Sequence, residues 1–357
     1  MRGVRAPPNG GDIKVAEIKK ILKFKSGCSI RRTTDNQMLC RPTNNYSNIA
    51  GFLRERKMHM ASDPILLNFT KKPSSMASYV KLITGKRKGL KPGESLPLLQ
   101  GRCAHMGIDP LNLQKYNHLC GLKDSQHLPL LYPHILAAPL HLSMVSHSAF
   151  PLKMMGSIHL SNHILQHRSI GRSERLDIEC SLGAKRNVEK GLEFDIDTKV
   201  SNGKEVVWES ITTAFIRGKF GEADKGEGRS KLSMTEEARL VGEWPVPAGT
   251  GRRYAVITGD FNPIHLFPMT AKLFGFKRDI AHGMWSLANA VGRLDMEVGD
   301  RPVRIDAAFK GPMFMESTAK LYAKAYESGQ KFDVYCSGNE KPVICADIQW
   351  VEPGGSL

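Results

Sequence analysis

The stretch YAVITGDFNPIH, residues 254–265, is the starting point for interpreting the rest of the chain. Gly259 and Pro263 interrupt its apolar pattern, which predicts a turn or a short irregular helix. Asp260 and His265 stand within it, five positions apart. A carboxylate and an imidazole this close can face one small space, where one takes a proton and the other holds or returns it. The stretch therefore indicates an acid–base pair.

A second run, FGFKRDIAHGMWSLANAV, begins at Phe274. Its apolar residues at helical spacing, which predict a helix, are Ile280, Met284, Leu287, Ala288 and Val291. His282 and Gly283 precede most of them and mark the start of that helix. A free backbone N–H at a helix N-terminus is suited to binding a developing negative oxygen.

The pattern GDFNPIH followed by IAHGM resembles the signature of the MaoC-like, R-specific enoyl thioester hydratases. The matching positions are Tyr254, Gly259, Asp260, Asn262, Pro263, His265, Ala271, Gly275, Phe276, Ile280, His282 and Gly283. One departure is Thr258, where many members have serine. The resemblance implies a catalytic dyad of Asp260 and His265, supported by Asn262. It also implies an oxyanion N–H at Gly283, with Ala281 and His282 beside the substrate.

The implied activity is that of a hydro-lyase in fatty acid metabolism, of the enoyl-CoA hydratase 2 or 3-hydroxyacyl-[acyl-carrier-protein] dehydratase type. It adds water reversibly to trans-2-enoyl thioesters and gives (R)-3-hydroxyacyl thioesters. No metal and no cofactor are required. The expected partner is the thioester of coenzyme A or of acyl-carrier protein. Lys272, Lys277 and Arg278 are candidates for its phosphates, although a solvated helix face explains them equally well.

Two other functions remain open. The chain could be a thioesterase with the hot-dog fold, which the MaoC-like hydratases also have, but those thioesterases resemble one another through other residues. A non-catalytic scaffold that binds acyl carriers is the second alternative, although this chain keeps every residue that the hydration needs.

Charge argues against nucleic acid as a partner. The net charge is +16, but residues 1–92 hold 20 Lys+Arg and 5 Asp+Glu, a balance of +15. The remainder holds 51−20=31 basic and 35−5=30 acidic residues, a balance of +1. The body is therefore close to neutral. The 7 cysteines form no CxxC pair, which fits a reducing compartment.

The composition predicts four segments. Residues 1–75 form a basic leader, disordered or targeting, and a basic amphipathic helix at residues 12–25 makes a mitochondrial location the first expectation. A cytoplasmic or peroxisomal location, or a true start at a later methionine, remains open. A degenerate hot dog follows at 76–217, a Gly-rich linker at 218–231 and the MaoC-like hot dog at 232–357.

The predicted fold class is α+β, with two hot-dog units, each an antiparallel sheet around one helix. The two units would make a monomeric pseudo-dimer or a homodimer. The run at 128–145 is a core helix, broken near Pro139, and no membrane span is expected. Strand-like runs follow each helix, with a hairpin turn at 201–204.

An internal repeat supports two units. Residues 116–128 align without a gap on residues 254–266, pairing Tyr116 with Tyr254, Gly121 with Gly259 and His127 with His265. Leu122 stands where Asp260 should be. After a seven-residue deletion, Ala138 falls on Gly283. The first unit is therefore expected to have lost its dyad, and a chance match is the alternative.

Overall fold

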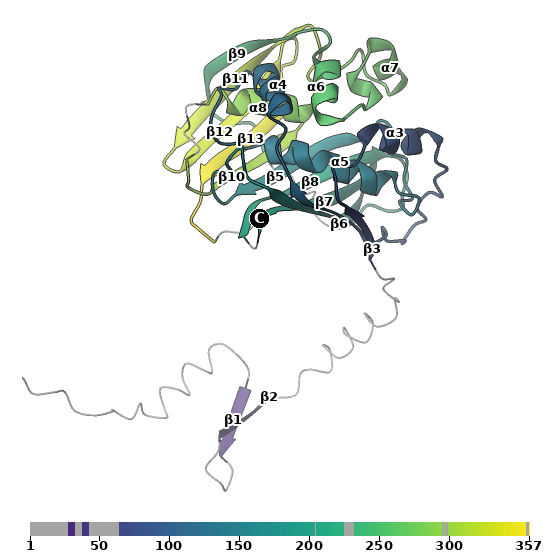
Figure 1. The fold of residues 1–357 in the computed structure, drawn as a ribbon, viewed down its shortest axis with the longest axis vertical. Coiled ribbons are helices and arrows are strands. Elements are labelled where there is room, and N and C mark those ends of the chain that lie inside the picture. The colour runs from purple at the N-terminus through teal and green to yellow at the C-terminus, as the bar shows by residue number, and fades with distance from the viewer. Residues whose placement is uncertain are drawn as a thin grey trace, which may run out of the picture. The chain divides into compact units, whose positions relative to one another are not determined.

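The structure is a computed structural model that describes residues 28–32, 38–42, 64–203, 205–224, 232–294, 296, 299–354 and 357. The chain divides into two compact units, Met1–Ser62 and Asp63–Leu357. In the first unit, β1 (Cys28–Arg32) and β2 (Met38–Pro42) pair antiparallel. The second unit contains all the other described elements (Figure 1).

An 11-stranded sheet is the frame of the second unit. In spatial order its strands are β3 (Ile65–Phe69), β4 (Leu99–Met106), β6 (Leu176–Val188), β7 (Gly191–Asn202), β8 (Glu205–Arg217), β5 (Ile158–Gln166), β10 (Val303–Phe309), β13 (Ile344–Trp350), β12 (Gly329–Cys336), β11 (Ser317–Tyr326) and β9 (Arg239–Val246). Strands β3 and β4 are parallel, and the other neighbours are antiparallel. Strands β5 and β10 join the two halves, with fully buried Ile164 opposite Ile305. Because each half of the sheet wraps one helix, the predicted α+β fold of two hot-dog units is confirmed.

The central helices are α5 (Tyr132–Ser146) in the first half and α8 (Gly283–Val291) in the second. Nearly all of α5 is buried, as expected of a helix that is apolar on all sides. It runs through Pro139 without the predicted break. The Ser143 hydroxyl donates to the Pro139 carbonyl at 2.8 Å, inside the turn that follows the proline. No helix in the described ranges is long and apolar enough to cross a membrane.

Four shorter helices cover the same side of the sheet: α3 (Ser75–Thr84), α4 (Pro110–Cys120), α6 (Thr250–Thr258) and α7 (Pro268–Leu273) (Figure 1). The Asp109 carboxylate caps α4 by accepting from the N–H groups of residues 111 and 112. The side chain of Asn112 then links three helices, because it donates to the Ile257 carbonyl and accepts from the Tyr132 hydroxyl, both at 2.9 Å.

The first part of the predicted repeat is confirmed. Helices α4 and α6 each contain a buried tyrosine, Tyr116 and Tyr254, whose ring centroids lie 6.3 Å apart. Each helix ends at a glycine with left-handed backbone, Gly121 (φ 64°) and Gly259 (φ 80°). Glycine adopts this conformation without steric cost, which explains its place at both helix ends.

Beyond these glycines the two halves differ in length. The Leu128 N–H donates to the Ile170 carbonyl at 2.8 Å, just as the Ala281 N–H donates to the Met313 carbonyl at 2.8 Å. Leu128 therefore occupies the position of Ala281. Leu128 lies seven positions after Gly121, the glycine that ends α4, whereas Ala281 lies 22 positions after Gly259, the glycine that ends α6. The first half is thus 15 residues shorter at this point, and its described residues contain no counterpart of α7.

The second part of the predicted alignment is therefore wrong. His127 is exposed and forms an isolated antiparallel β-bridge with Gly171, whereas His265 is buried. Ala138 lies in the second turn of α5, away from the N-terminal position that Gly283 has in α8. The gapless alignment ran across the missing segment. Leu122 directly follows Gly121 as Asp260 follows Gly259, so the acid is lost by exchange of one residue, whereas the counterpart of His265 is lost with the missing segment.

The folded body begins earlier than predicted. Strand β3 lies inside the expected leader of residues 1–75, and its Ile65 N–H donates to the Leu98 carbonyl at 2.7 Å. An apolar stretch of five residues is too short to identify as a strand without its partner. The predicted helix at 12–25 and residues 225–231 of the predicted linker lie outside the described residues.

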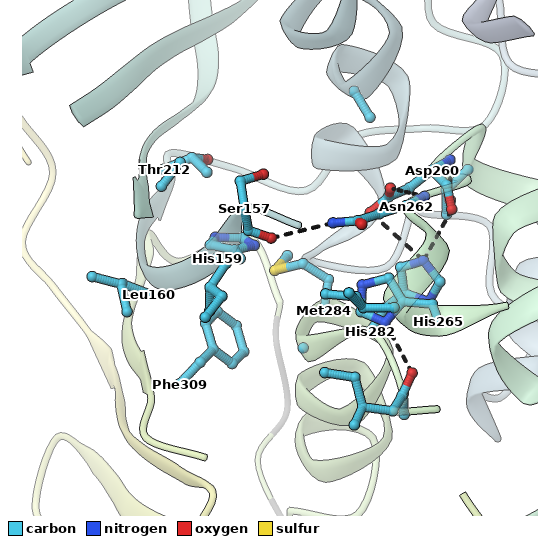
Figure 2. Close-up of a pocket in the computed structure, with 18 of the residues that line it drawn as sticks. Ser157, His159, Leu160, Thr212, Asp260, Asn262, His265, His282, Met284 and Phe309 are labelled. Atoms are coloured by element: carbon cyan, nitrogen blue, oxygen red, sulfur yellow. Dashed lines mark hydrogen bonds and ion pairs between the residues drawn. The ribbon is translucent and has the colours of Figure 1, made fainter. Parts of the chain in front are cut away.

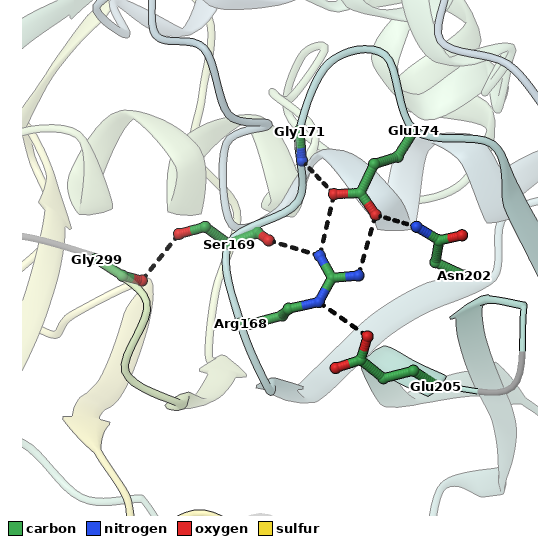
Figure 3. Close-up of polar contacts among 7 residues, drawn as sticks. All are labelled: Arg168, Ser169, Gly171, Glu174, Asn202, Glu205 and Gly299. Carbon is green, nitrogen blue, oxygen red and sulfur yellow. Dashed lines mark hydrogen bonds and ion pairs between the residues drawn. The ribbon is translucent and has the colours of Figure 1, made fainter.

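An ion-pair network fixes the loop that follows β5 (Figure 3). The Arg168 guanidinium bonds both carboxylate oxygens of Glu174, at 3.0 and 3.1 Å, and one of Glu205, at 3.1 Å. The neighbouring Ser169 hydroxyl donates to the Gly299 carbonyl at 2.9 Å. The last contact ties this loop to the segment that leads into β10.

Candidate active site

The irregular segment after α6 positions Asp260 and His265. Helix α6 is capped by Gly259, and the 3₁₀ helix η2 (Pro263–His265) begins four positions later. A Cβ on Gly251 would lie 2.0 Å from the His265 carbonyl oxygen. Glycine in α6 therefore allows the close approach that brings η2 against the helix.

The Asp260 carboxylate is held by hydrogen bonds at one oxygen, while its Oδ2 has the longer contact of 3.6 Å to His282 Nε2. Its Oδ1 accepts from the Tyr79 hydroxyl at 2.7 Å and from the Asn262 N–H at 3.1 Å. The side chain keeps 43% of its surface accessible, and Asp260 lines a cavity. Burial raises the pKa of Asp260, but the nearby imidazoles of His282 and His265 and these two hydrogen bonds outweigh it. The net pKa lies below the ordinary value.

His265 is a buried neutral imidazole with a defined tautomer. Its Nδ1 lies 2.9 Å from the Ile280 carbonyl oxygen, which can only accept, so Nδ1 carries the proton. The lone pair of Nε2 is then free. Burial, followed by the neighbouring His282, lowers the pKa of His265, while Asp260 opposes this in part. The side chain can therefore accept a proton, and the cation that results gives it up readily.

His282 contacts both His265 and Asp260. Its ring stacks on that of His265 with centroids 3.7 Å apart, and its Nε2 donates to the Asp260 carbonyl at 3.1 Å. Burial lowers its pKa, against the effect of Asp260. Its Nδ1 has no partner among the described residues. The predicted substrate contact is thus also a brace that fixes both members of the dyad.

Gly283 is the first residue of α8, where N–H groups lack acceptors within the helix. It lines the same cavity as the dyad. A Cβ here would lie 2.7 Å from two ring atoms of Phe309, so glycine lets that ring pack against the helix start. The N–H of Ala281 is already bonded to a carbonyl. Of the N–H groups of Ala281 and Gly283, that of Gly283 is therefore the candidate to bind an oxyanion.

Asn262 connects the dyad to the first half of the fold. Its Nδ2 donates to the Ser157 carbonyl at 3.2 Å, and Ser157 directly precedes β5. The Asn262 Oδ1 is buried without a partner among the described residues. The supporting role that the resemblance implied agrees with this geometry.

A cavity of about 480 Å³ joins both halves at this point. Figure 2 shows the dyad and His282 facing His159, Leu160 and Phe309. The second half supplies the candidate reactive groups, and the first half supplies apolar residues together with three histidines from α5, β5, β7 and β8. Ala138 lines this wall, whereas Ala137 is fully buried and does not.

The three predicted phosphate contacts lie apart from this cavity. Lys272 and Lys277 are exposed, and neither lines it. The Arg278 guanidinium pairs with the carboxylates of Glu316 and Asp279. Binding of phosphates by these three residues stays a prediction.

Asp260, His265 and His282 also form a possible metal-binding group, with donor atoms within 4.8 Å of one another. Their hydrogen bonds argue against it. His282 Nε2 carries the proton that it donates to the Asp260 carbonyl, so that nitrogen has no lone pair to offer. The lone pair of His282 is then on the buried Nδ1, so His265 Nε2 and an Asp260 oxygen are the acceptors left at this point, which suits a proton-transfer pair better than a structural metal site.

Sequence reasoning missed the residues of the first half that reach the site. Tyr79 is separated from Asp260 by 181 positions, and no motif surrounds it. No sequence motif marks His134, His141 or His159, yet all three line the cavity. Strand pairing across the whole sheet brings them there, and local patterns carry no signal of that.

Comparisons with known proteins agree with this geometry. Residues 233–343 match the MaoC like domain family. The 3-hydroxyacyl-thioester dehydratase X of Mycobacterium tuberculosis (strain ATCC 25618 / H37Rv) is 32% identical over 279 residues, which cover 78% of this chain and 98% of that protein. The crystal structure of M. tuberculosis HtdX superposes with a TM-score of 0.62 at 29% identity, covering 71% of this chain and 100% of that one. The crystal structure of a MaoC-like dehydratase from Phytophthora capsici superposes with a TM-score of 0.59 at 20% identity, covering 74% of this chain and 98% of that one.

Proposed function

This chain belongs to the MaoC-like dehydratase family, and on that premise we propose that it is a hydro-lyase that interconverts trans-2-enoyl and (R)-3-hydroxyacyl thioesters. The observation that carries the proposal is the convergence of three groups on one cavity. These are the Asp260 carboxylate, the free Nε2 of His265 and the N–H of Gly283.

The attacking water is placed between the two side chains of the dyad, whose ligand atoms lie within 4.8 Å of one another. Asp260 Oδ2 and His265 Nε2 are both acceptors, so each takes one hydrogen of that water. As the water oxygen attacks carbon 3, one O–H bond breaks and its proton passes to His265. The Asp260 carboxylate stabilises the imidazolium that forms.

The electron pair of the carbon 2–carbon 3 double bond moves towards the thioester carbonyl and forms an enolate. The N–H of Gly283 stabilises the enolate oxygen; loss of one such donor typically lowers the rate by about 10²–10³. The proton on His265 then returns to carbon 2, and the thioester re-forms. The low pKa of His265 favours this second transfer. Dehydration is the same sequence in reverse.

Hydration of crotonyl-CoA, measured as loss of the enoyl thioester absorbance, tests the proposal. Asp260→Asn and His265→Gln should each retain less than about a tenth of wild-type turnover, because general acid–base groups contribute about 10²–10⁴. Melting temperatures of both variants check that the fold is intact. His127→Gln is the matched control, since this histidine is exposed and away from the cavity.

The same experiment separates the alternative functions. Release of free thiol without hydration would indicate a thioesterase. Absence of both reactions in wild-type protein would indicate a non-catalytic scaffold. A tenth or more of wild-type turnover in either dyad variant would contradict the dyad assignment.

Three further properties are proposals that rest on the sequence. The thioester carrier is coenzyme A or acyl-carrier protein, and kcat/KM on both carriers decides between them. Mitochondrial import is tested by fusing residues 1–62 to a fluorescent protein. A pseudo-dimeric monomer and a homodimer are distinguished by sedimentation equilibrium.

A further inference from the structure

Three histidines form one wall of the cavity in the first half of the fold. His134 and His141 come from α5, and His159 comes from β5. The ring of His134 stacks on that of His159 at 5.8 Å and meets that of His141 edge-on at 5.6 Å. All three line the cavity, and we call them the histidine wall. The water activation described above does not use them.

Hydrogen bonds fix how these rings present their nitrogens. His159 Nε2 lies 3.1 Å from the Ser161 carbonyl oxygen, so it carries the proton and Nδ1 has a lone pair. Nδ2 of Asn162, an amide nitrogen that only donates, lies 3.5 Å from both His134 Nδ1 and His159 Nε2 and 3.3 Å from the Thr212 hydroxyl oxygen. Because His159 Nε2 carries a proton, His134 Nδ1 is the ring nitrogen that can accept from this amide, which places the proton of His134 on Nε2. Among the described residues, neither His159 Nδ1 nor His134 Nε2 has a hydrogen-bond partner.

The histidine wall is uncharged at neutral pH. Burial lowers the pKa of His141 to about 3 and that of His159 to about 4, with the imidazole of His159 adding to the effect at His141. Burial and the two other rings also lower the pKa of His134. Neutral imidazoles can bind a polar, uncharged group, but they do not supply the cation that a buried carboxylate or phosphate needs.

The wall lies next to the reaction centre. The ring of Phe309 lies 4.8 Å from that of His159, and it also packs against Gly283. On the other side, Met284 Sδ lies 3.6 Å from Nδ2 of Asn162. An acyl chain whose thioester oxygen meets Gly283 therefore reaches the wall within the length of the cavity.

We propose that the histidine wall binds a hydroxyl group on the acyl chain, so that the preferred substrates are hydroxylated 2-enoyl thioesters. A hydroxyl both donates and accepts, which matches the lone pair of His159 Nδ1 and the N–H of His134 Nε2. An unsubstituted alkyl chain displaces water from these nitrogens and leaves them unpaired in a buried site, which is unfavourable. This inference rests on the proposed function.

The test compares pairs of 2-enoyl thioesters of equal chain length, with and without one hydroxyl, at each position from carbon 5 to the terminal carbon. At one position or more, the hydroxylated substrate should have a kcat/KM at least about tenfold higher than its alkyl partner, because sites built to bond a hydroxyl discriminate strongly against its absence. This measurement needs only the wild-type protein. Crotonyl thioester, which is too short to carry the hydroxyl, is included as the reference for hydration itself.

Variants locate the preference. His159→Phe and His134→Leu should each bring the ratio of the two kcat/KM values close to one. His127→Leu, the matched control, should leave the ratio and the crotonyl rate unchanged, since His127 lies outside the cavity.

Each outcome decides one question. If wild-type protein hydrates crotonyl thioester but prefers no hydroxylated substrate, the inference about the wall is overturned while the proposed function stands. A preference that survives both wall variants also overturns it. If no substrate is hydrated, crotonyl thioester included, the proposed function fails and the inference fails with it.

Discussion

Replacing Tyr79 by phenylalanine removes one oxygen atom from the site and leaves the ring in place. The lost atom is the hydroxyl that donates to Asp260 Oδ1 at 2.7 Å. Burial, followed by the charge of Asp260, raises the pKa of Tyr79, so the hydroxyl keeps its proton and acts as a donor. In wild-type protein this bond holds Oδ1 and leaves Oδ2 to face the water.

The size of the effect follows from this geometry. A hydrogen bond to a charged group contributes about 1.5–3 kcal/mol. The Asn262 N–H still holds the same oxygen at 3.1 Å, and 43% of the Asp260 side chain is accessible, so water can replace part of the loss. We take the lower end, about 1.5 kcal/mol, which is close to tenfold in rate. The loss should appear in kcat, with KM little changed, because Tyr79 orients a reactive group.

The pH profile gives a second readout. The Tyr79 bond is one of the interactions that lower the pKa of Asp260. Its removal therefore raises that pKa, and activity that depends on the ionised carboxylate should be lost at a higher pH as the solution is acidified. A merely structural role for Tyr79 would not move this limb of the profile.

The matched control is Tyr326→Phe, which also removes a tyrosine–aspartate hydrogen bond. The Tyr326 hydroxyl donates to Asp347 Oδ1 at 2.5 Å on the outer surface, and neither residue lines the cavity. Crotonyl-CoA hydration is measured for both variants across pH. If Tyr79→Phe keeps wild-type kcat and an unshifted acid limb, the reasoning about Asp260 is refuted.

Three further predictions concern the cavity, the oxyanion site and the loop that follows β5. Ala138→Phe places a ring in the cavity wall, so kcat/KM should fall about tenfold or more for long acyl thioesters and stay near wild type for crotonyl thioester; equal losses for both would show that the chain runs elsewhere. Gly283→Ala pushes its Cβ into the Phe309 ring at 2.7 Å, and kcat should fall about 10²-fold, with partial recovery when Phe309→Leu is added; no recovery would exclude the clash as the cause. The pKa of Glu174 is raised by burial but lowered more by Arg168 and two N–H donors, so its net pKa is below the ordinary 4.5, its contribution to stability is present above that pH, and it is lost as the pH falls through the folded value. Glu174→Gln should cost about 1 kcal/mol at pH 7 and flatten the acid side of the unfolding profile, whereas the more exposed Glu205→Gln should cost less; equal effects of the two would count against this explanation.

Local patterns were sufficient for most elements. The predicted hairpin is supported by the pairing of Asn202 with Glu205 and by Gly203 at a φ of 63°, and the strands that follow each central helix are where alternation predicted them. The prediction failed where partners decide the structure. Strand β3 is identified by its pairing with β4, and α5 continues through Pro139 because it is buried on all sides. The predicted alignment of the repeat is correct up to Gly121 and wrong beyond it, because residue identities alone do not show the length of a missing segment.

The sequence alone was enough to predict the start of α8 and to propose the dyad, because Asp260, His265 and Gly283 lie within 24 positions of one another and carry a distinctive spacing. The short backbone connections between them leave few arrangements, so local chemistry and local geometry coincide. Only the tertiary structure decided what surrounds them. Tyr79 and the histidine wall reach the cavity because β5 and β10 pair and join two halves that are far apart in sequence. Such contacts depend on the whole sheet closing around both helices, and no short stretch of the chain encodes them.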